Sequence, residues 1–586
     1  MNFFKTFLAS CLGSLIALIV LTILFFAVLV ASFSSDEKVT EVSSNSVLHL
    51  KLNLPINEME VENPFEGLPL PGAEETPMGL ITLKNVIEHA KSDEAIRGIF
   101  LDVGMFQGGY SVGKEIRDAL LDFQKSGKWI VAYSEYYSEA SYYVASVADK
   151  VYLNPEGEIE FNGLAAEVTF FKKMFDKLEI HPEIFRVGEF KSAVEPFFLD
   201  KMSESNRLQI KELIDGINKS TKHEVSESRK ISDDEIMKIA DHMLVTNSTE
   251  AQQYKLVDSL LYYDQVQSDL RHRLGLSKNE KISFVKYSKY KKSFTAPVSN
   301  SKNEIAVIVA DGDILQGKAK EGVIGSETFA EELRKARTNE KVKAIVLRIN
   351  SPGGSAIASD IMWREVSLAS KEKPIIASMS NYAASGGYYL AMGCDSIVSE
   401  PNTITGSIGV FSVLFDLSSF LDKKIGITFD EVKTGDFGEM ATFTRPLTPM
   451  EKSIWQKRTD KIYESFTSKA AQGRHMPIEK LLAVASGRVW TGTQAKEKGL
   501  VDVLGGLEDA VNIAAKKAGI ENDFKLKYYP KQKNFLSQWL QGMEENSKVK
   551  LLKEELGENY SVYEQLKNVQ RLQGVQARLP YEFQWK

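Results

Sequence analysis

The stretch IVAYSEYYSEASYYVASVADKVYLNP (130–155) has a second copy in the same chain, IASMSNYAASGGYYLAMGCDSIVSEP (376–401), at an offset of 246 residues. Eight of the 26 aligned positions are identical. The same offset carries IRGIFLDVG (96–104) onto VKAIVLRIN (342–350). Because one offset holds across two separated blocks, the sequence indicates a tandem duplication.

Each half alternates short apolar runs, rich in β-branched residues, with helical patterns. In the second half we expect strands at 304–310, 343–350 and 373–380, and helices at 330–337, 358–370 and from about residue 386. Such alternation is typical of β-α-β units around a buried sheet. The sequence therefore predicts an α/β fold that occurs twice.

The chain, 586 residues long, exceeds what one hydrophobic core accommodates. A polar stretch at 289–303 separates the two halves. We expect four segments: an N-terminal transmembrane anchor and its flank at 1–35, a first repeat at 36–298, a second repeat at 299–525, and a helical C-terminal tail at 526–586. The amphipathic pattern of the tail favours a packing or oligomer-contact helix.

The N-terminal segment carries no charged residue from Thr6 to Ser35. An α-helix needs roughly 20 apolar residues to cross a bilayer, whereas the apolar part of a secretory signal is about 7–15 residues long. The length therefore favours a retained single-pass anchor over a cleaved signal peptide, although LVAS (29–32) could serve as a processing site. Lys5 precedes the run and Asp36 follows it, which places the body of the protein outside the cytoplasm.

The composition argues against several classes of protein. A net charge of −7 gives no support for nucleic-acid binding. The two cysteines, Cys11 and Cys394, lie far apart, and Cys11 falls in the apolar run, so we expect no disulfide. The seven histidines show no ligand spacing. We therefore expect neither a metal nor another cofactor.

Two glycine-containing motifs in the second half point to a catalytic site. NSPGGS (350–355) follows a predicted strand, and its glycines leave the backbone free to present N–H groups to a ligand. In SNYAASGGYY (380–389), Ser385 lies between a predicted strand and a predicted helix, where a tight turn would expose its hydroxyl. Taken singly, these motifs are more often explained by an ordinary turn and by a helix-capping serine.

A serine hydroxyl needs a base to remove its proton, and no histidine lies in a suitable context. A lysine can serve if apolar surroundings lower its pKa, and Ser–Lys pairs are an accepted variant of the catalytic triad. Most lysines are solvated surface groups, so a catalytic lysine must be identified by its position in the sequence.

YAASGGYY and NSPGG, together with EFKSAVEPF (189–197) in the first half, resemble the signal peptide peptidase A family in its long, duplicated form. That family has a ClpP/crotonase-like fold. The resemblance implies that Ser385 is the nucleophile, that Lys191 is the general base, and that the N–H groups of Gly386 and Gly354 form the oxyanion hole. It also implies that Ser407, in TGSIG, helps to orient the lysine, and that the protein forms a tetramer.

The duplication supplies an independent argument for this pair. Ser385 aligns with Glu139 in the first half, and Lys191, in VGEFK (187–191), aligns with Gly438 in TGDFG (434–438). Each half thus keeps one member of the pair and lacks the other. This pattern suggests a single composite site between the repeats, although unselected positions also diverge.

Three functions remain in view. The first is a membrane-anchored serine protease of the cell inner membrane, with its body on the periplasmic side, that cleaves hydrophobic peptides such as remnant signal peptides. The second is a crotonase-like acyl-CoA enzyme, which shares the backbone oxyanion site but needs neither the serine nor the anchor. The third is a catalytically silent membrane scaffold. If Lys191 is the base, activity should rise with pH through its lowered pKa.

Overall fold

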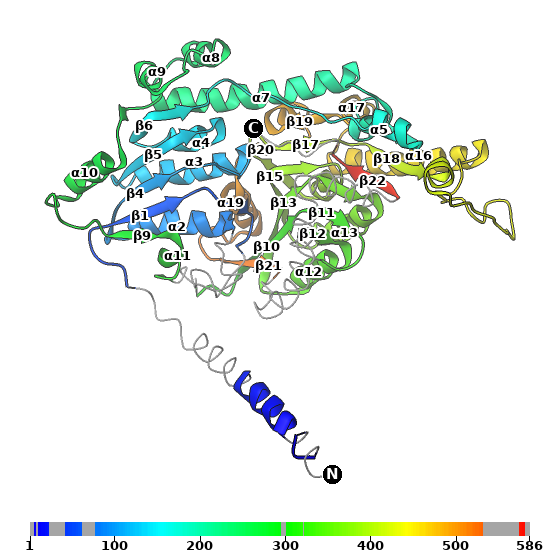
Figure 1. Ribbon diagram of the computed structural model, residues 1–586, viewed down its shortest axis with the longest axis horizontal. Coiled ribbons are helices and arrows are strands. Elements are labelled where there is room, and N and C mark those ends of the chain that lie inside the picture. Colours follow the sequence, from blue (N-terminus) through cyan, green and yellow to red (C-terminus); the bar gives the residue numbers. More distant parts are fainter. Residues whose placement is uncertain are drawn as a thin grey trace.

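The computed structural model describes residues 5–7, 10–22, 41–60, 77–294, 300–319, 322–530 and 574–579. In Figure 1 the first repeat, in blue to green, lies beside the second, in lighter green to orange, and the long helix α7 (Glu204–Arg229) runs along both. Two parallel sheets form the centres of the repeats, and a third sheet is shared between them.

The central sheets of the two repeats have the same strand order. That of the first repeat is β8 (Ser259–Leu260), β6 (Lys150–Ile159), β5 (Trp129–Tyr137), β4 (Ile96–Asp102), β1 (Ser46–Lys51) and β9 (Phe284–Lys286). That of the second is β20 (Val503–Leu504), β16 (Ser396–Ser399), β15 (Ile375–Ala384), β13 (Val342–Ser351), β10 (Glu304–Asp311) and β21 (Lys525–Tyr529). All pairings along both orders are parallel. The expected duplication of an α/β unit is thus present.

Helices cover both faces of each sheet, which explains why the strands read as nearly continuous apolar runs. The longer ones are α2 (Leu80–Ser92), α3 (Tyr110–Gln124) and α10 (Tyr263–Leu274) in the first repeat, and α12 (Ser326–Thr338), α13 (Ala356–Ala369), α16 (Pro449–Gly473) and α19 (Leu507–Ala518) in the second. The short ones include α4 (Glu139–Ala145), α5 (Lys172–Leu178), α6 (Glu195–Phe198), α8 (Asp233–Asp241), α9 (Ser248–Gln253), α14 (Gly386–Ala391), α17 (Ile478–Val484) and α18 (Gly492–Glu497). The helices expected at 330–337, 358–370 and from 386 correspond to α12, α13 and α14.

The third sheet combines strands from both repeats and from the C-terminal tail. Its order is β12 (Val323–Gly325), β11 (Asp313–Leu315), β14 (Gly353–Ser355), β22 (Val575–Arg578), β18 (Val410–Asp416) and β7 (His181–Val187). Strand β7 of the first repeat pairs antiparallel with β18 of the second over seven residues. On the central sheet of the second repeat, β17 (Ile404–Gly406) and β19 (Val489–Thr491) continue beyond β15.

The C-terminal tail differs from the expectation of a helix over 526–586. Strand β21 extends the second sheet to Tyr529, and within 574–579 the backbone forms strand β22. The edges of β14 and β18 carry backbone N–H and C=O groups that need partners, and an extended segment between them satisfies both edges at once. Residues 531–573 and 580–586, which contain the amphipathic pattern, lie outside the described residues.

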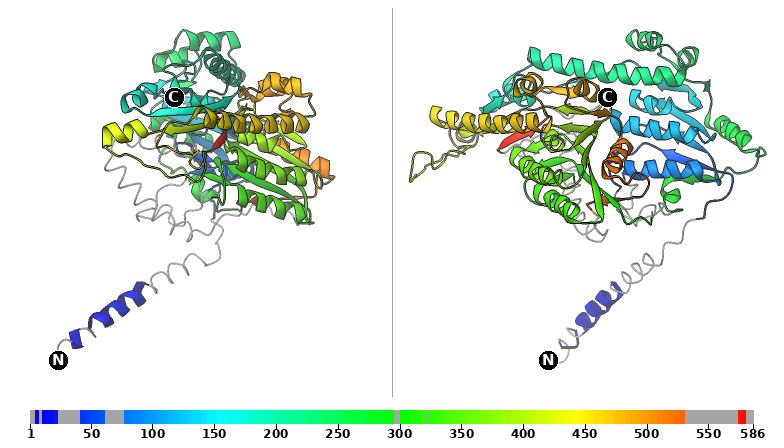
Figure 2. Two further views of the ribbon diagram at one scale, coloured as in Figure 1. Left: turned by 90° about the vertical axis from the view of Figure 1, so that its right-hand side faces the viewer. Right: turned by 180° about the vertical axis from the view of Figure 1, so that it is seen from behind.

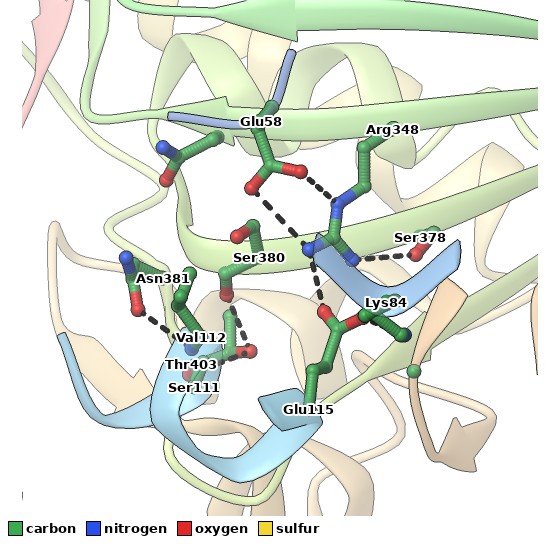
Figure 3. A network of polar contacts seen from close by, with 12 residues as sticks. Glu58, Lys84, Ser111, Val112, Glu115, Arg348, Ser378, Ser380, Asn381 and Thr403 are labelled. Atoms are coloured by element: carbon green, nitrogen blue, oxygen red, sulfur yellow. Dashed lines mark hydrogen bonds and ion pairs between the residues drawn. The ribbon is translucent and has the colours of Figure 1, made fainter. Parts of the chain in front are cut away.

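A buried polar network joins the two repeats (Figure 3). The Arg348 side chain, on β13, is fully buried and donates to Glu58 at 2.7 Å and to Ser378 at 3.0 Å, and it also pairs with Glu115 on α3. Lys84 lies 2.6 Å from the second oxygen of Glu115. Burial would raise the pKa of Glu115, but Arg348 and Lys84 outweigh it and lower that pKa to about 2.

The N-terminal helix Lys5–Thr22 is long and apolar enough to cross a membrane, and it buries none of its surface against the rest of the protein. Figure 2 shows it standing apart from the body. A signal sequence near an N-terminus has the same character. The rest of the expected anchor, residues 23–35, lies outside the described residues.

Candidate active site

Ser385 lies on a tight turn between strand β15 and helix α14, as its sequence context predicts. Its backbone has φ 55° and ψ −109°, a conformation that a non-glycine residue adopts only when the surroundings impose it. The Ser385 N–H donates to the Gly406 carbonyl at 2.8 Å, which holds the turn in place. The hydroxyl oxygen lies 3.4 Å from the Gly409 carbonyl oxygen.

Lys191 reaches the same point from the first repeat. It follows β7 and precedes a single turn of 3-10 helix, Ser192–Val194. Its Nζ lies 2.9 Å from Ser385 Oγ, 3.0 Å from Ser407 Oγ and 3.3 Å from the Ser407 carbonyl oxygen. The structure therefore brings together the three side chains that the sequence singled out, from segments that are 194 and 216 residues apart.

The surroundings of Lys191 disfavour its charged form. The side chain is fully buried, and burial lowers the pKa of Lys191 well below that of an ordinary lysine. No charged neighbour among the described residues contributes to this shift. A lowered pKa increases the fraction of neutral amine at a given pH, and a neutral amine can accept a proton from a serine hydroxyl.

Two glycines of the second repeat, which the sequence did not single out, enclose Lys191. A Cβ on Gly487 would lie 2.7 Å from the backbone nitrogen and from the Cβ of Lys191, and a Cβ on Gly409 would lie 3.2 Å from its Cδ. The Phe190 N–H also donates to the Ser486 carbonyl at 3.0 Å. The loop around Gly487 thus packs closely against Lys191 and fixes its position. Its SGR motif (486–488) has no distinctive composition, so only the spatial neighbourhood reveals it.

The expected oxyanion glycines lie beside the serine. A Cβ on Gly353 would be 2.7 Å from the Gly386 nitrogen, so the glycine loop and the turn after Ser385 are in contact. The Gly353 N–H donates to Ser351 Oγ at 3.2 Å. That bond leaves the N–H groups of Gly354 and Gly386 as the candidate donors for an oxyanion.

The first repeat carries an ion pair at the position that corresponds to the serine. Glu139, the counterpart of Ser385, is buried, pairs with Lys222 and accepts from the N–H groups of Asn162 and Gly163 at 3.0 and 2.9 Å. Gly438, the counterpart of Lys191, lies in an exposed turn before α16. Among these four positions, Lys191 and Ser385 form the pair that brings an amine next to a hydroxyl.

The groups at the site fit serine catalysis. Among the residues that the structure describes, no group of three or more His, Cys, Asp or Glu side chains is arranged to hold a metal ion. A hydroxyl, a buried amine with a lowered pKa and two backbone N–H groups are the kinds of group that acyl transfer uses as nucleophile, base and oxyanion donors.

Known proteins match both halves of the chain. The profile of peptidase family S49 matches residues 122–277 and again 367–521. The chain is 37% identical to Protease 4 of Salmonella typhi over 473 residues, which cover 79% of this chain and 76% of that protein. It is 35% identical to the chloroplastic serine protease SPPA of Arabidopsis thaliana, over 82% of this chain and 70% of that protein, and 35% identical to Protease 4 of Haemophilus influenzae, over 83% and 82%. The chain therefore belongs to peptidase family S49, in the long form that carries the domain twice, and it is a serine protease.

Proposed function

We propose that the protein is a membrane-anchored endopeptidase in which Ser385 is the nucleophile and Lys191 the general base. The separation of 2.9 Å between Lys191 Nζ and Ser385 Oγ, in a fully buried setting, carries this proposal. General-base catalysis requires about 2.6–3.2 Å between the heavy atoms that exchange the proton. The strand order of the two repeats is consistent with the ClpP/crotonase-like fold that the sequence resemblance implies.

The proposed reaction begins when Ser385 Oγ attacks the carbonyl carbon of a peptide bond and neutral Lys191 takes its proton. Negative charge develops on the carbonyl oxygen and is stabilised by the N–H groups of Gly354 and Gly386. Lys191 then donates the proton to the leaving amine, and an acyl-enzyme remains. Water, activated by Lys191, hydrolyses the ester. Ser407, which contacts Lys191 Nζ through both of its oxygens, keeps the amine aimed at the serine.

The proposed substrates are hydrophobic peptides such as remnant signal peptides, as the resemblance to signal peptide peptidase A suggests. The apolar helix Lys5–Thr22 supports an anchor that would keep the body beside the membrane, where such peptides remain after secretion. We place the protein in the inner membrane as a single-pass protein, with its body on the periplasmic side. We further propose, on the same resemblance, that it assembles as a homotetramer.

A crotonase-like acyl-CoA enzyme is the rival catalytic function, and a silent scaffold is the other. A fluorophosphonate probe separates them, because it reacts only with an activated serine. Labelling of Ser385 supports the peptidase. Unlabelled folded protein that turns over CoA thioesters would support the crotonase, and folded protein with neither activity would support the scaffold.

The decisive variants are Ser385→Ala and Lys191→Ala, each assayed for hydrolysis of a hydrophobic fluorogenic peptide. Both should abolish turnover, since removing one member of such a dyad removes nucleophilic catalysis. Ser141→Ala is the matched control, because Ser141 is a buried serine in the corresponding helix of the first repeat. Wild-type rates in either dyad variant would refute the proposal.

A further inference from the structure

Asn350 lies where strand β13 leads into the glycine loop, and its side chain is bonded to the strand of the proposed nucleophile. Its amide oxygen accepts from the Tyr382 N–H of β15 at 3.2 Å. Its amide nitrogen donates to Asp311 Oδ1, at the end of β10, at 2.9 Å. One side chain thus joins the ends of three neighbouring strands, β10, β13 and β15.

The hydrogen bond to β15 lies at an irregularity in the pairing of β13 and β15. The register shifts between Ile349 and Ser351, where three residues of β15 (380–382) face Asn350 alone. An interrupted ladder leaves backbone N–H groups that need other acceptors, and the Asn350 side chain supplies one. Ser385 follows this irregularity by three residues. The bond therefore holds β15 just before the turn that carries the proposed nucleophile.

The backbone of Asn350 and the residue after it hold the glycine loop. The Asn350 carbonyl accepts from the Gly312 N–H at 3.0 Å, and Ser351 Oγ donates to the Gly312 carbonyl at 2.7 Å. Ser351 Oγ also accepts from the Gly353 N–H at 3.2 Å. Asn350 is thus connected through its side chain to the nucleophile strand and through its backbone to the loop of the proposed oxyanion donors.

The first repeat lacks this arrangement, although its sheet has the same strand order. At the offset of 246 residues, Gly104 is the counterpart of Asn350 and has no side chain that could cross to β5. Tyr136 is the counterpart of Tyr382, and its N–H donates to Ser134 Oγ at 3.2 Å. The first repeat therefore satisfies this N–H within its own strand.

The second repeat contains the same serine but does not use it in this way. Ser380 is the counterpart of Ser134, and its Oγ is buried without a hydrogen-bond partner among the described residues. The Tyr382 N–H donates to Asn350 instead. An unpaired buried hydroxyl is destabilising. Its presence in the repeat that carries Ser385 indicates that the bond from Asn350 serves the site rather than stability alone.

Asp311 determines which way the Asn350 amide faces. A carboxylate accepts hydrogen bonds and donates none, so it must meet the NH2 group, and the amide oxygen is then turned toward Tyr382. Burial raises the pKa of Asp311 to about 6, and the carboxylate form predominates above that value. Asp311 Oδ2 also accepts from the Glu58 N–H at 3.4 Å, and Glu58 pairs with Arg348 (Figure 3). The buried network between the repeats thus continues to the active site.

We propose that Asn350 is a positioning residue that holds the nucleophile strand and the oxyanion loop in register, with Asp311 orienting its amide. This rests on the proposed function, in which Ser385 attacks and the N–H groups of Gly354 and Gly386 stabilise the oxyanion. Without the Asn350 side chain, the end of β15 and the glycine loop can shift apart, and the serine and its oxyanion donors then no longer meet the same carbonyl group. A misplacement of about 1 Å costs roughly 100-fold in rate.

The first test is hydrolysis of a hydrophobic fluorogenic peptide by the full chain in detergent, at mildly alkaline pH, where the carboxylate form of Asp311 predominates. Asn350→Ala should lower kcat by roughly 100-fold and leave KM unchanged, because it disturbs the reacting groups and not the binding of the peptide. The rate at which a fluorophosphonate labels Ser385 should fall in parallel.

Asn154→Ala is the matched control in the first repeat. Asn154 is also a partly buried asparagine with one donated and one accepted hydrogen bond, to Tyr133 Oη at 3.3 Å and from the Glu156 N–H at 3.0 Å. Its replacement should lower thermal stability to a similar degree and leave kcat unchanged. An equal loss of kcat in the two variants would show that the effect on Asn350 reports stability and would overturn the proposal.

The second test exchanges the two partners, and it decides the matter if Asn350→Ala fails to fold. Asn350→Asp places two carboxylates in contact and should be slow. Adding Asp311→Asn restores an amide donor that faces a carboxylate, whose other oxygen can accept from the Tyr382 N–H. The double variant should therefore regain most of the lost kcat. A double variant no faster than Asn350→Asp would overturn the proposal.

Failure of this inference differs from failure of the proposed function. Wild-type kcat in Asn350→Ala, with Ser385→Ala and Lys191→Ala inactive, would overturn the positioning role and leave the dyad standing. Peptide hydrolysis that survives in Ser385→Ala or Lys191→Ala would overturn both.

Discussion

Gly487→Ala tests whether the second repeat positions the base of the first. The new Cβ would lie 2.7 Å from the Lys191 nitrogen and Cβ and 2.8 Å from its Cα. Carbon atoms pack at about 3.5–4.0 Å, so the Lys191 backbone must move by roughly 1 Å. A displacement of this size at a catalytic group costs about 100-fold in rate, which corresponds to about 2.7 kcal/mol of transition-state stabilisation.

The assay is kcat/KM for a hydrophobic fluorogenic peptide, with active sites titrated by a fluorophosphonate. Gly487 has φ 78°, so alanine there also costs about 1–2 kcal/mol of backbone strain. Gly519→Ala is the matched control, because Gly519 has φ 67° and a Cβ added there would meet nothing within 4 Å. Both variants should lose similar thermal stability, whereas only Gly487→Ala should lose activity. Equal activity in the two variants would show that the loop does not position Lys191.

Three other perturbations address the charges of the protein. The peptidase rate should rise with pH through the lowered pKa of Lys191, since only the neutral amine accepts a proton, and a rate that falls steadily from mild acid to mild alkali would contradict this. Lys191→Arg should be inactive at every pH, because its guanidinium stays protonated. In urea unfolding, Arg348→Met should lose about 3–5 kcal/mol, because Glu58 would stay buried without its partner and Glu115 would keep only Lys84. Lys211→Met, in an exposed pair, should lose about 0.5 kcal/mol or less, and similar losses in the two variants would refute the argument. Burial and nearby Glu115 raise the pKa of Glu400 well above 4.5 in the folded protein. The contribution of protonated Glu400 to the stability of the fold is therefore complete below pH 4.5 and is lost as the pH rises toward the folded pKa. Glu400→Gln should stabilise the protein more at pH 8 than at pH 4, and a gain that does not depend on pH would show that the charge of Glu400 is not its cause.

The features that the sequence predicted are the local and the repeated ones. Strands such as β13 and β15 contain short, continuous apolar runs with β-branched residues, and the length and composition of these runs identify them. Ser385 and Lys191 could be identified from the sequence because short motifs mark them and because the duplication shows that each half lacks one of them. Their proximity was an expectation from resemblance and alignment, and the structure places them 2.9 Å apart.

The features that the sequence did not predict depend on contacts between distant segments. Arg348 lies inside the apolar run KAIVLRIN, and nothing local reveals that its partner Glu58 is 290 residues away. Strand β22 is only four residues long and gains its hydrogen bonds from two strands that precede it by more than 150 residues. Short extended segments carry little periodicity, so a helical tail was the simpler expectation.

In the proposed mechanism, the separation of Lys191 and Ser385 along the chain also determines when the enzyme can first cut. A growing polypeptide is synthesised from its N-terminal end at about 5–20 residues per second, and its domains fold in that order. Lys191 precedes Ser385 by 194 residues. The half that is made first contains Lys191 but not Ser385. The loop around Gly487, which packs against Lys191, is made later still. On the proposed mechanism, therefore, peptide cleavage is not possible until most of the chain has been synthesised, and a fragment that ends before Ser385 is inactive.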